Sequence, residues 1–135
     1  STTAGSVVVP TFSSASLFTQ GGLRIHRVRI IKNNATNTNA SFIVHFFRDV
    51  VTVTNGDNAA FSVVGDGSSW IGAIPVVMSS STAVHASGGV YDGFPTDPIM
   101  GDLAGTTLYA LLAARAAYTP ASAEVFTIVP LIERS

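Results

Sequence analysis

Short apolar runs alternate with turn-forming residues along most of the chain. Asn-Gly, Gly-Gly and Asp-Gly pairs recur at intervals too short for helices of ordinary length. The runs between them are rich in β-branched and aromatic residues, which favour strands. The pattern predicts at least six strands, at residues 23–32, 41–47, 58–64, 69–78, 108–115 and 123–132.

The tract LRIHRVRIIK, residues 23–32, changes its alternation midway. The apolar phase that includes Ile25 gives way to the opposite phase at Val28. Side chains alternate between the two faces of a strand, so this slip would turn the arginines to a new face unless an extra residue absorbed it. We therefore predict a β-bulge near His26 or Arg27.

One apolar tract and three single residues carry further information about the strands. The tract SFIVHFF, residues 41–47, is apolar on both faces, which predicts a central strand covered on both sides. His45 inside it is better explained as a hydrogen-bonded core histidine than as a metal ligand. Pro75 and Pro130 lack the backbone N–H, so their strands should lie at a sheet edge or carry a bulge.

The tract LYALLAARAA, residues 108–117, gives conflicting signals. Alanine and leucine favour a helix, whereas period-two spacing puts Leu108 and Leu112 on one face and Leu111 and Arg115 on the other. The flanking threonines and the β-rich segment that follows favour a strand. We predict a strand, with Arg115 marking its exposed or subunit-facing side.

Charge is scarce in this 135-residue chain. Only 11% of residues are charged, against about 25% in ordinary soluble domains, and the mean hydropathy is +0.42. A surface of small and hydroxyl-bearing residues suits repeated packing against neighbours, although a neutral monomer would have the same composition. The length predicts a single domain, residues 1–135.

The charge balance also bears on partners. A net charge of −1 argues against nucleic acid, which needs a basic surface. Arg24, Arg27, Arg29 and Lys32 nevertheless lie within ten positions, either as a docking face for an acidic partner or, more simply, as the solvated side of one strand. The longest apolar tract is too short for a membrane span and contains Arg115.

No residue pattern indicates catalysis or a cofactor. His26, His45 and His85 are scattered singly, without metal-ligand spacing. Asp57 and Asp66 lie in stretches that suggest a calcium loop but lack the alternating acidic spacing of one. There is no nucleophile elbow and no glycine-rich phosphate loop. We therefore predict that the chain is not an enzyme and carries no metal or cofactor.

An aromatic residue offers one alternative. Trp70 is better explained as a core residue packing across a sandwich, but an exposed tryptophan face can hold a sugar ring. A carbohydrate-binding or receptor-binding module using Trp70 or Tyr91 is therefore the second functional hypothesis.

Two blocks of the sequence carry a family resemblance. The tract NASFIVHFFRDVVTVTNGDNAAFSV, residues 39–63, and the tract LYALLAARAAYTPASAEVFTIVPLIE, residues 108–133, resemble small structural proteins of tailed-bacteriophage virions. The unusual combination of Tyr118-Thr119-Pro120 with Glu124 carries most of the likeness. It implies a capsid decoration or cement protein, with a head-completion or tail component as the next option, and a C-terminal hairpin that turns at residues 119–123.

The resemblance implies a fold, a location and partners. The fold is an all-β antiparallel β-sandwich or jelly-roll-like barrel with Greek-key connections. The residues themselves, rather than the resemblance, predict an extended arm or first strand at residues 1–18 and a long loop at residues 79–105, where this sequence departs from the family pattern. The location is a virion assembled in the host cytoplasm. The partners are the major capsid protein or another virion protein, bound by a homotrimer. The expected contact residues are Val7, Val8, Val9, Phe12, Arg24, Arg27, Arg29, Tyr91, Phe94 and Arg115.

Overall fold

Strands make up all the regular secondary structure that the computed structural model describes, namely in residues 10–34, 41–53, 62–65, 67–78, 83–85, 88–115 and 123–134. The strands are β1 (Thr11–Phe12), β2 (Gly22–Lys32), β3 (Ser41–Phe47), β4 (Trp70–Val77), β5 (Ala83–His85), β6 (Gly88–Gly93), β7 (Ile99–Asp102), β8 (Leu108–Ala114) and β9 (Phe126–Arg134). Within these ranges no helix occurs that could cross a membrane.

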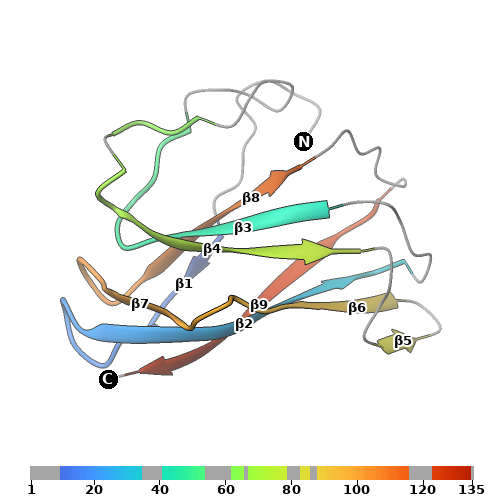
Figure 1. The fold of residues 1–135 in the computed structure, drawn as a ribbon, viewed down its shortest axis with the longest axis horizontal. Coiled ribbons are helices and arrows are strands. Elements are labelled where there is room, and N and C mark those ends of the chain that lie inside the picture. Colours follow the sequence, from blue (N-terminus) through green and yellow to red (C-terminus); the bar gives the residue numbers. More distant parts are fainter. Residues whose placement is uncertain are drawn as a thin grey trace.

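The strands form two antiparallel sheets that pack face to face (Figure 1). Sheet A has the order β1-β8-β3-β4. Sheet B has the order β5-β6-β2-β7, and β9 pairs with the other edge of β2. β6 and β7 pair with successive halves of β2, so β2 lies at the centre of sheet B. The predicted all-β sandwich is confirmed.

The predicted bulge lies in β2. The register against β9 shifts between Ile25 and Arg27, so His26 is the extra residue. Ile25 and Val28 on either side of the bulge are both fully buried. The bulge therefore keeps the apolar residues of both halves of β2 in the core and the arginines on the opposite face.

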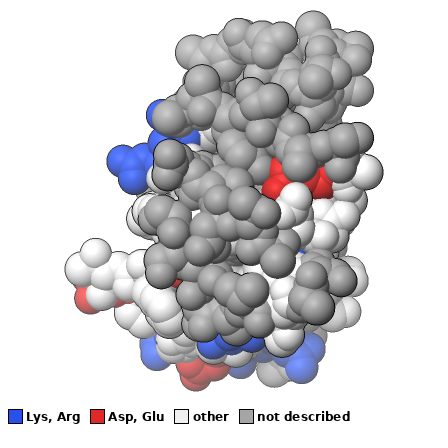
Figure 2. All heavy atoms as spheres, turned by 90° about the vertical axis from the view of Figure 1, so that its right-hand side faces the viewer, with Lys and Arg blue, Asp and Glu red and all other residues white. Residues whose placement is uncertain are grey.

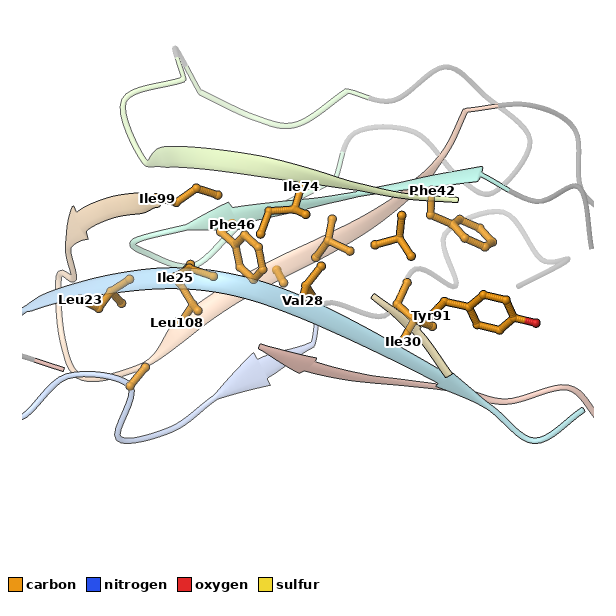
Figure 3. Packing of buried hydrophobic residues seen from close by; sticks show 14 of the residues in the cluster. Leu23, Ile25, Val28, Ile30, Phe42, Phe46, Ile74, Tyr91, Ile99 and Leu108 are labelled. Atoms are coloured by element: carbon orange, nitrogen blue, oxygen red, sulfur yellow. The ribbon is translucent and has the colours of Figure 1, made fainter. Parts of the chain in front are cut away.

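The core lies between the two sheets (Figure 3). β2 contributes Ile25, Val28 and Ile30, which point toward Phe42 and Phe46 of β3. The ring of Phe126 packs edge-on against that of Phe42, with centroids 5.5 Å apart, and joins β9 to sheet A. Full burial of an apolar side chain such as Ile25 or Phe46 stabilises the fold by about 1.5–3 kcal/mol.

The central position predicted for residues 41–47 is confirmed, because β3 lies between β8 and β4. Its two faces differ, however. Phe42, Val44 and Phe46 are buried in the core, whereas Ile43 and His45 on the other face are only half-buried. The prediction that the strand is covered on both sides was therefore only partly correct.

Residues 108–114 form a strand, as their context predicted, but the expected C-terminal hairpin is wrong. β8 pairs with β1 and β3 in sheet A, whereas β9 pairs with β2 in sheet B. The chain thus crosses from one sheet to the other between these strands. Leu108 and Ala110 face the main core, and Leu111 packs on the other face with Phe47 and Val51.

The long loop expected at residues 79–105 is also wrong, because β5, β6 and β7 lie in it. Glycine replaces the usual β-branched residues there for steric reasons. A Cβ on Gly89 would lie 3.0 Å from the Tyr91 ring, and one on Gly93 would collide with the carbonyl oxygen of Pro75 in β4. Glycine therefore lets β6 approach the edge strand of sheet A closely.

Both prolines lie on edge strands, as predicted, since in the described part of the chain β4 pairs only with β3 and β9 only with β2. The N–H of Asn33 donates to the carbonyl of Val125 at 3.2 Å, which marks a hydrogen-bonded pair. Pair types alternate along an antiparallel ladder, so the Val28–Pro130 pair is of the other type. The missing N–H of Pro130 therefore points away from β2.

Several predictions fall outside the described residues or at their margin. Val7, Val8 and Val9 of the predicted arm, and Asp57 and Asp66 of the rejected calcium loops, are among the residues outside. In the described part of residues 1–18, the strand β1 is formed by Thr11 and Phe12. Of the strand predicted at 58–64, the described part shows one isolated bridge, between Val63 and Val53.

Candidate functional site

The outer face of sheet B gathers most of the charged strand residues. Alternation along β2 and β9 turns their core residues inward and the residues between them outward. We call this outer surface the arginine face. It comprises Arg24, His26, Arg27, Arg29 and Ile31 of β2, Asp92 of β6, Met100 of β7, and Thr127, Val129, Leu131 and Glu133 of β9.

Arg29 and Asp92 form the best-defined ion pair of the arginine face. Nε and Nη2 of Arg29 donate to the two carboxylate oxygens of Asp92 at 2.8 and 3.1 Å. The hydrogen bond to Asp92, and then its charge, raise the pKa of Arg29 above its ordinary value. The Asp92 side chain is only 6% exposed, so this two-bond pair neutralises one arginine from within the sheet.

A second, exposed pair lies at the bulge. His26 Nε2 and Glu133 Oε2 are 2.8 Å apart. The hydrogen bond from His26, followed by the charge of Arg24, lowers the pKa of Glu133. A shallow cleft of about 390 Å³ opens beside them, with Arg24, Met100 and Asp102 in its lining. Acidic side chains thus accompany the arginines at both ends of the face.

Apolar side chains lie between these charges. Val129 pairs with Arg29 and is 43% exposed, and Leu131 pairs with Arg27 and is 47% exposed. Met100 pairs with Arg24 at the β7 edge. Figure 2, with sheet B at the lower side as in Figure 1, shows basic and acidic atoms next to each other along the lower rim. The face is therefore mixed rather than uniformly basic.

The predicted contact residues separate into groups. Arg24, Arg27 and Arg29 share the arginine face, and exposed Phe94 follows Gly93, the partner of Val28 beside the bulge. Exposed Arg115 follows β8 in sheet A, away from them.

Two of the predicted contact residues belong to the interior. Phe12 is half-buried and packs against the main core. Tyr91 is 1% exposed, so its prediction as a surface contact or sugar platform is wrong. Burial, and then the charge of Glu124, raise the pKa of the Tyr91 hydroxyl.

The single lysine of the chain is not on the solvated side of its strand. Lys32 Nζ lies 3.3 Å from Glu124 Oε1, and the two side chains are 0% and 1% exposed. The ammonium group also lies 5.9 Å from the centroid of the Tyr91 ring. The alternation of Val28, Ile30 and Lys32 was the signal for this burial, because it places Lys32 on the core face.

Trp70 is exposed, contrary to the core position predicted for it. Its side chain, at the start of β4, is 48% exposed. The indole Nε1–H donates to His45 Nδ1 at 3.1 Å, and the two ring centroids are 6.5 Å apart. His45 is hydrogen-bonded as predicted, but on the outer face of sheet A, where burial lowers its pKa.

No cluster of three or more potential metal-ligating side chains occurs among the residues whose positions are described. A scan against models of protein families gives no match, and searches of curated proteins and of solved structures find no similar protein. The resemblance to phage virion proteins therefore stays a prediction.

Proposed function

We propose that the chain is a structural protein of a tailed-bacteriophage virion, of the capsid decoration or cement type. In this proposal the arginine face binds the major capsid protein or another virion protein and stabilises the shell. The observation that carries the proposal is the arginine face itself, where exposed apolar side chains lie among arginines, one of which, Arg29, is already paired with a carboxylate.

Paired charges make such a face suitable for burial. Removing an isolated charge from water is costly, and the cost falls when a well-oriented partner accompanies it. Arg29 has Asp92 as a partner within the same sheet, and His26 contacts Glu133. A protein that covers this face therefore needs no carboxylate for Arg29, whereas Arg27 Nε, which is buried without a hydrogen-bond partner in the described part of the chain, would need an acceptor.

The apolar side chains would supply the binding energy. Val129 and Leu131 project from β9 and Met100 from β7, the two strands that both pair with β2, and all three are at least 43% exposed. Interfaces that combine exposed apolar side chains with arginines are typical of protein complexes. We further propose that copies bind as homotrimers, so that each covers several neighbouring shell subunits.

Co-sedimentation with capsids stripped of this protein tests the proposal. Val129→Arg places a bulky charge within the arginine face and should abolish capsid binding. Val77→Arg is the matched control, because Val77 is an exposed valine (53%) on β4 of sheet A. Equal binding by both variants, or no binding by the unaltered chain, would contradict the proposal. Analytical ultracentrifugation tests the trimer separately, since a monomer at every concentration rules it out.

A further inference from the structure

We propose that the protein covering the arginine face supplies a carboxylate, from an aspartate or glutamate side chain, to Arg27. This assignment rests on the function proposed above and names the chemical group that the bound protein must bring. Three observations support it: the charge balance of the face, the buried Nε of Arg27, and the exposed apolar side chains on either side of that residue.

The arginine face holds more arginines than carboxylates. The arginines are Arg24, Arg27 and Arg29, and the carboxylates are Asp92 and Glu133. Asp92 accepts two hydrogen bonds from Arg29. Glu133 contacts His26 and lies within the influence of the Arg24 charge. Among the described residues, Arg27 is therefore the arginine for which the face offers no carboxylate.

Arg27 also differs from Arg24 in its access to water. Arg24 is exposed, whereas Arg27 is half-buried, and its Nε is buried with no hydrogen-bond partner in the described part of the chain. A buried N–H that makes no hydrogen bond is unfavourable, and turning it outward to an acceptor breaks no existing bond. Arg27 is thus free to reorient toward a bound protein, whereas Arg29 would first have to leave Asp92.

Exposed apolar side chains flank Arg27 on both sides. Leu131 of β9 is its register partner and is 47% exposed. On the β6 side, Phe94 directly follows Gly93, the partner of Val28, and is 64% exposed. Interface hot spots are often arginines surrounded by contacts that exclude water. A protein that covers Leu131 and Phe94 would therefore also shut water away from Arg27.

The exclusion of water decides which group the partner must bring. A guanidinium that loses its water without gaining a partner is strongly destabilised. A backbone carbonyl would satisfy one N–H and leave the charge in place. A carboxylate accepts two hydrogen bonds from a guanidinium and neutralises its charge. The partner surface should thus present an aspartate or glutamate among apolar residues.

Binding to the stripped capsids described above measures the contribution of Arg27. Arg27→Gln should weaken binding roughly tenfold or more, because a charge-assisted pair inside the interface is lost. Arg24→Gln is the matched control, since it removes an exposed arginine from the same strand. It should bind within about threefold of the unaltered chain. Both variants lose one positive charge, so a general electrostatic effect would weaken them equally.

Carbodiimide crosslinking identifies the group that position 27 meets. Arg27→Lys places an amine there, and a carbodiimide joins an amine to a touching carboxylate while taking up the water that amide formation releases. The chain has a single lysine, Lys32, whose side chain is 0% exposed, so background coupling from native lysine is low. We expect a link from Arg27→Lys to an aspartate or glutamate of the capsid protein, located by mass spectrometry. Arg24→Lys should give little of this product.

The outcomes separate this proposal from the function on which it rests. Capsid binding by Arg27→Gln equal to that of the unaltered chain, no crosslink from Arg27→Lys, or equal crosslinking from both lysine variants would overturn the carboxylate and leave capsid binding in place. Absence of binding by the unaltered chain would overturn both. Thermal unfolding shows whether each variant is folded, and if Arg27→Gln is not, crosslinking of Arg27→Lys decides.

Discussion

The two sheets of the sandwich differ in how they carry charge. β1, β3, β4 and β8 of sheet A contain no Asp, Glu, Lys or Arg. Among the described residues, sheet B carries the Arg29–Asp92 ion pair and the His26–Glu133 hydrogen bond on its outer face, and Lys32 of its β2 pairs with Glu124 on the inner side. The charged strand residues of the described chain thus lie on one sheet, where some of them are paired, and the strands of the other sheet are free of formal charge. The predictions below test this difference.

Breaking the inner pair of sheet B should have the largest effect. Lys32→Met removes the ammonium group 3.3 Å from a carboxylate that is 1% exposed. Loss of one partner of a buried pair typically costs about 3–5 kcal/mol of unfolding free energy. Urea denaturation measures the loss. The double variant Lys32→Met/Glu124→Gln should recover part of it, and a single variant as stable as the unaltered chain would show that the pair is not structural.

Breaking the Arg29–Asp92 pair should lower the stability less than breaking the inner pair does. It should still lower it more than removing an arginine that has no such partner. Arg29→Met removes two hydrogen bonds to the shielded carboxylate of Asp92 and should lower Tm. Arg24→Met, on the same face and strand, removes an exposed charge and should leave Tm nearly unchanged. Equal Tm values for the two variants would contradict the distinction between paired and solvated arginines on the arginine face.

Alternation of apolar and polar residues was enough to predict two local features of the fold. The phase slip in LRIHRVRIIK located the bulge, because a strand has only two faces and its apolar residues must share one. Period two also identified residues 108–114 as a strand with two apolar faces. Periodicity does not identify the pairing partner, however, and so the hairpin between 108–114 and the last strand was wrong.

Other features were missed for reasons specific to each residue. β6 has the sequence GGVYDG, and its strand signal is weak because the space beside Tyr91 and Pro75 excludes side chains at Gly89 and Gly93. Trp70 was placed in the core by its size alone, since composition does not show that His45 can hold an indole at the surface. The arginines were recognised as a group, but Asp92, the partner of Arg29, is far away in sequence.

The smallest effect concerns His45, the histidine on the strands of sheet A. Burial lowers the pKa of His45 in the folded chain, while the unfolded chain keeps a value near 6.5. Below that pH the unfolded state binds more protons, so stability should be fully present above pH 6.5 and decline as pH falls toward the folded-state pKa. Thermal unfolding between pH 8 and pH 5 measures this decline.

Two variants assign the pH dependence to its source. His45→Gln should flatten the decline, whereas His26→Gln, which alters an exposed pair on sheet B, should not. A slope that persists in His45→Gln would mean that the acid sensitivity arises elsewhere in the protein.

The pairing of β2 with β9 also has a consequence for the order of folding. The register joins Leu23 to Arg134 and Lys32 to Phe126, so the longest ladder of the sandwich links strands near opposite ends of the sequence. Contacts between such distant segments form late and slow the folding rate. During synthesis β2 must wait until residues 33–125 and then β9 have been made before it meets this partner, and its apolar face would need protection from aggregation in that interval.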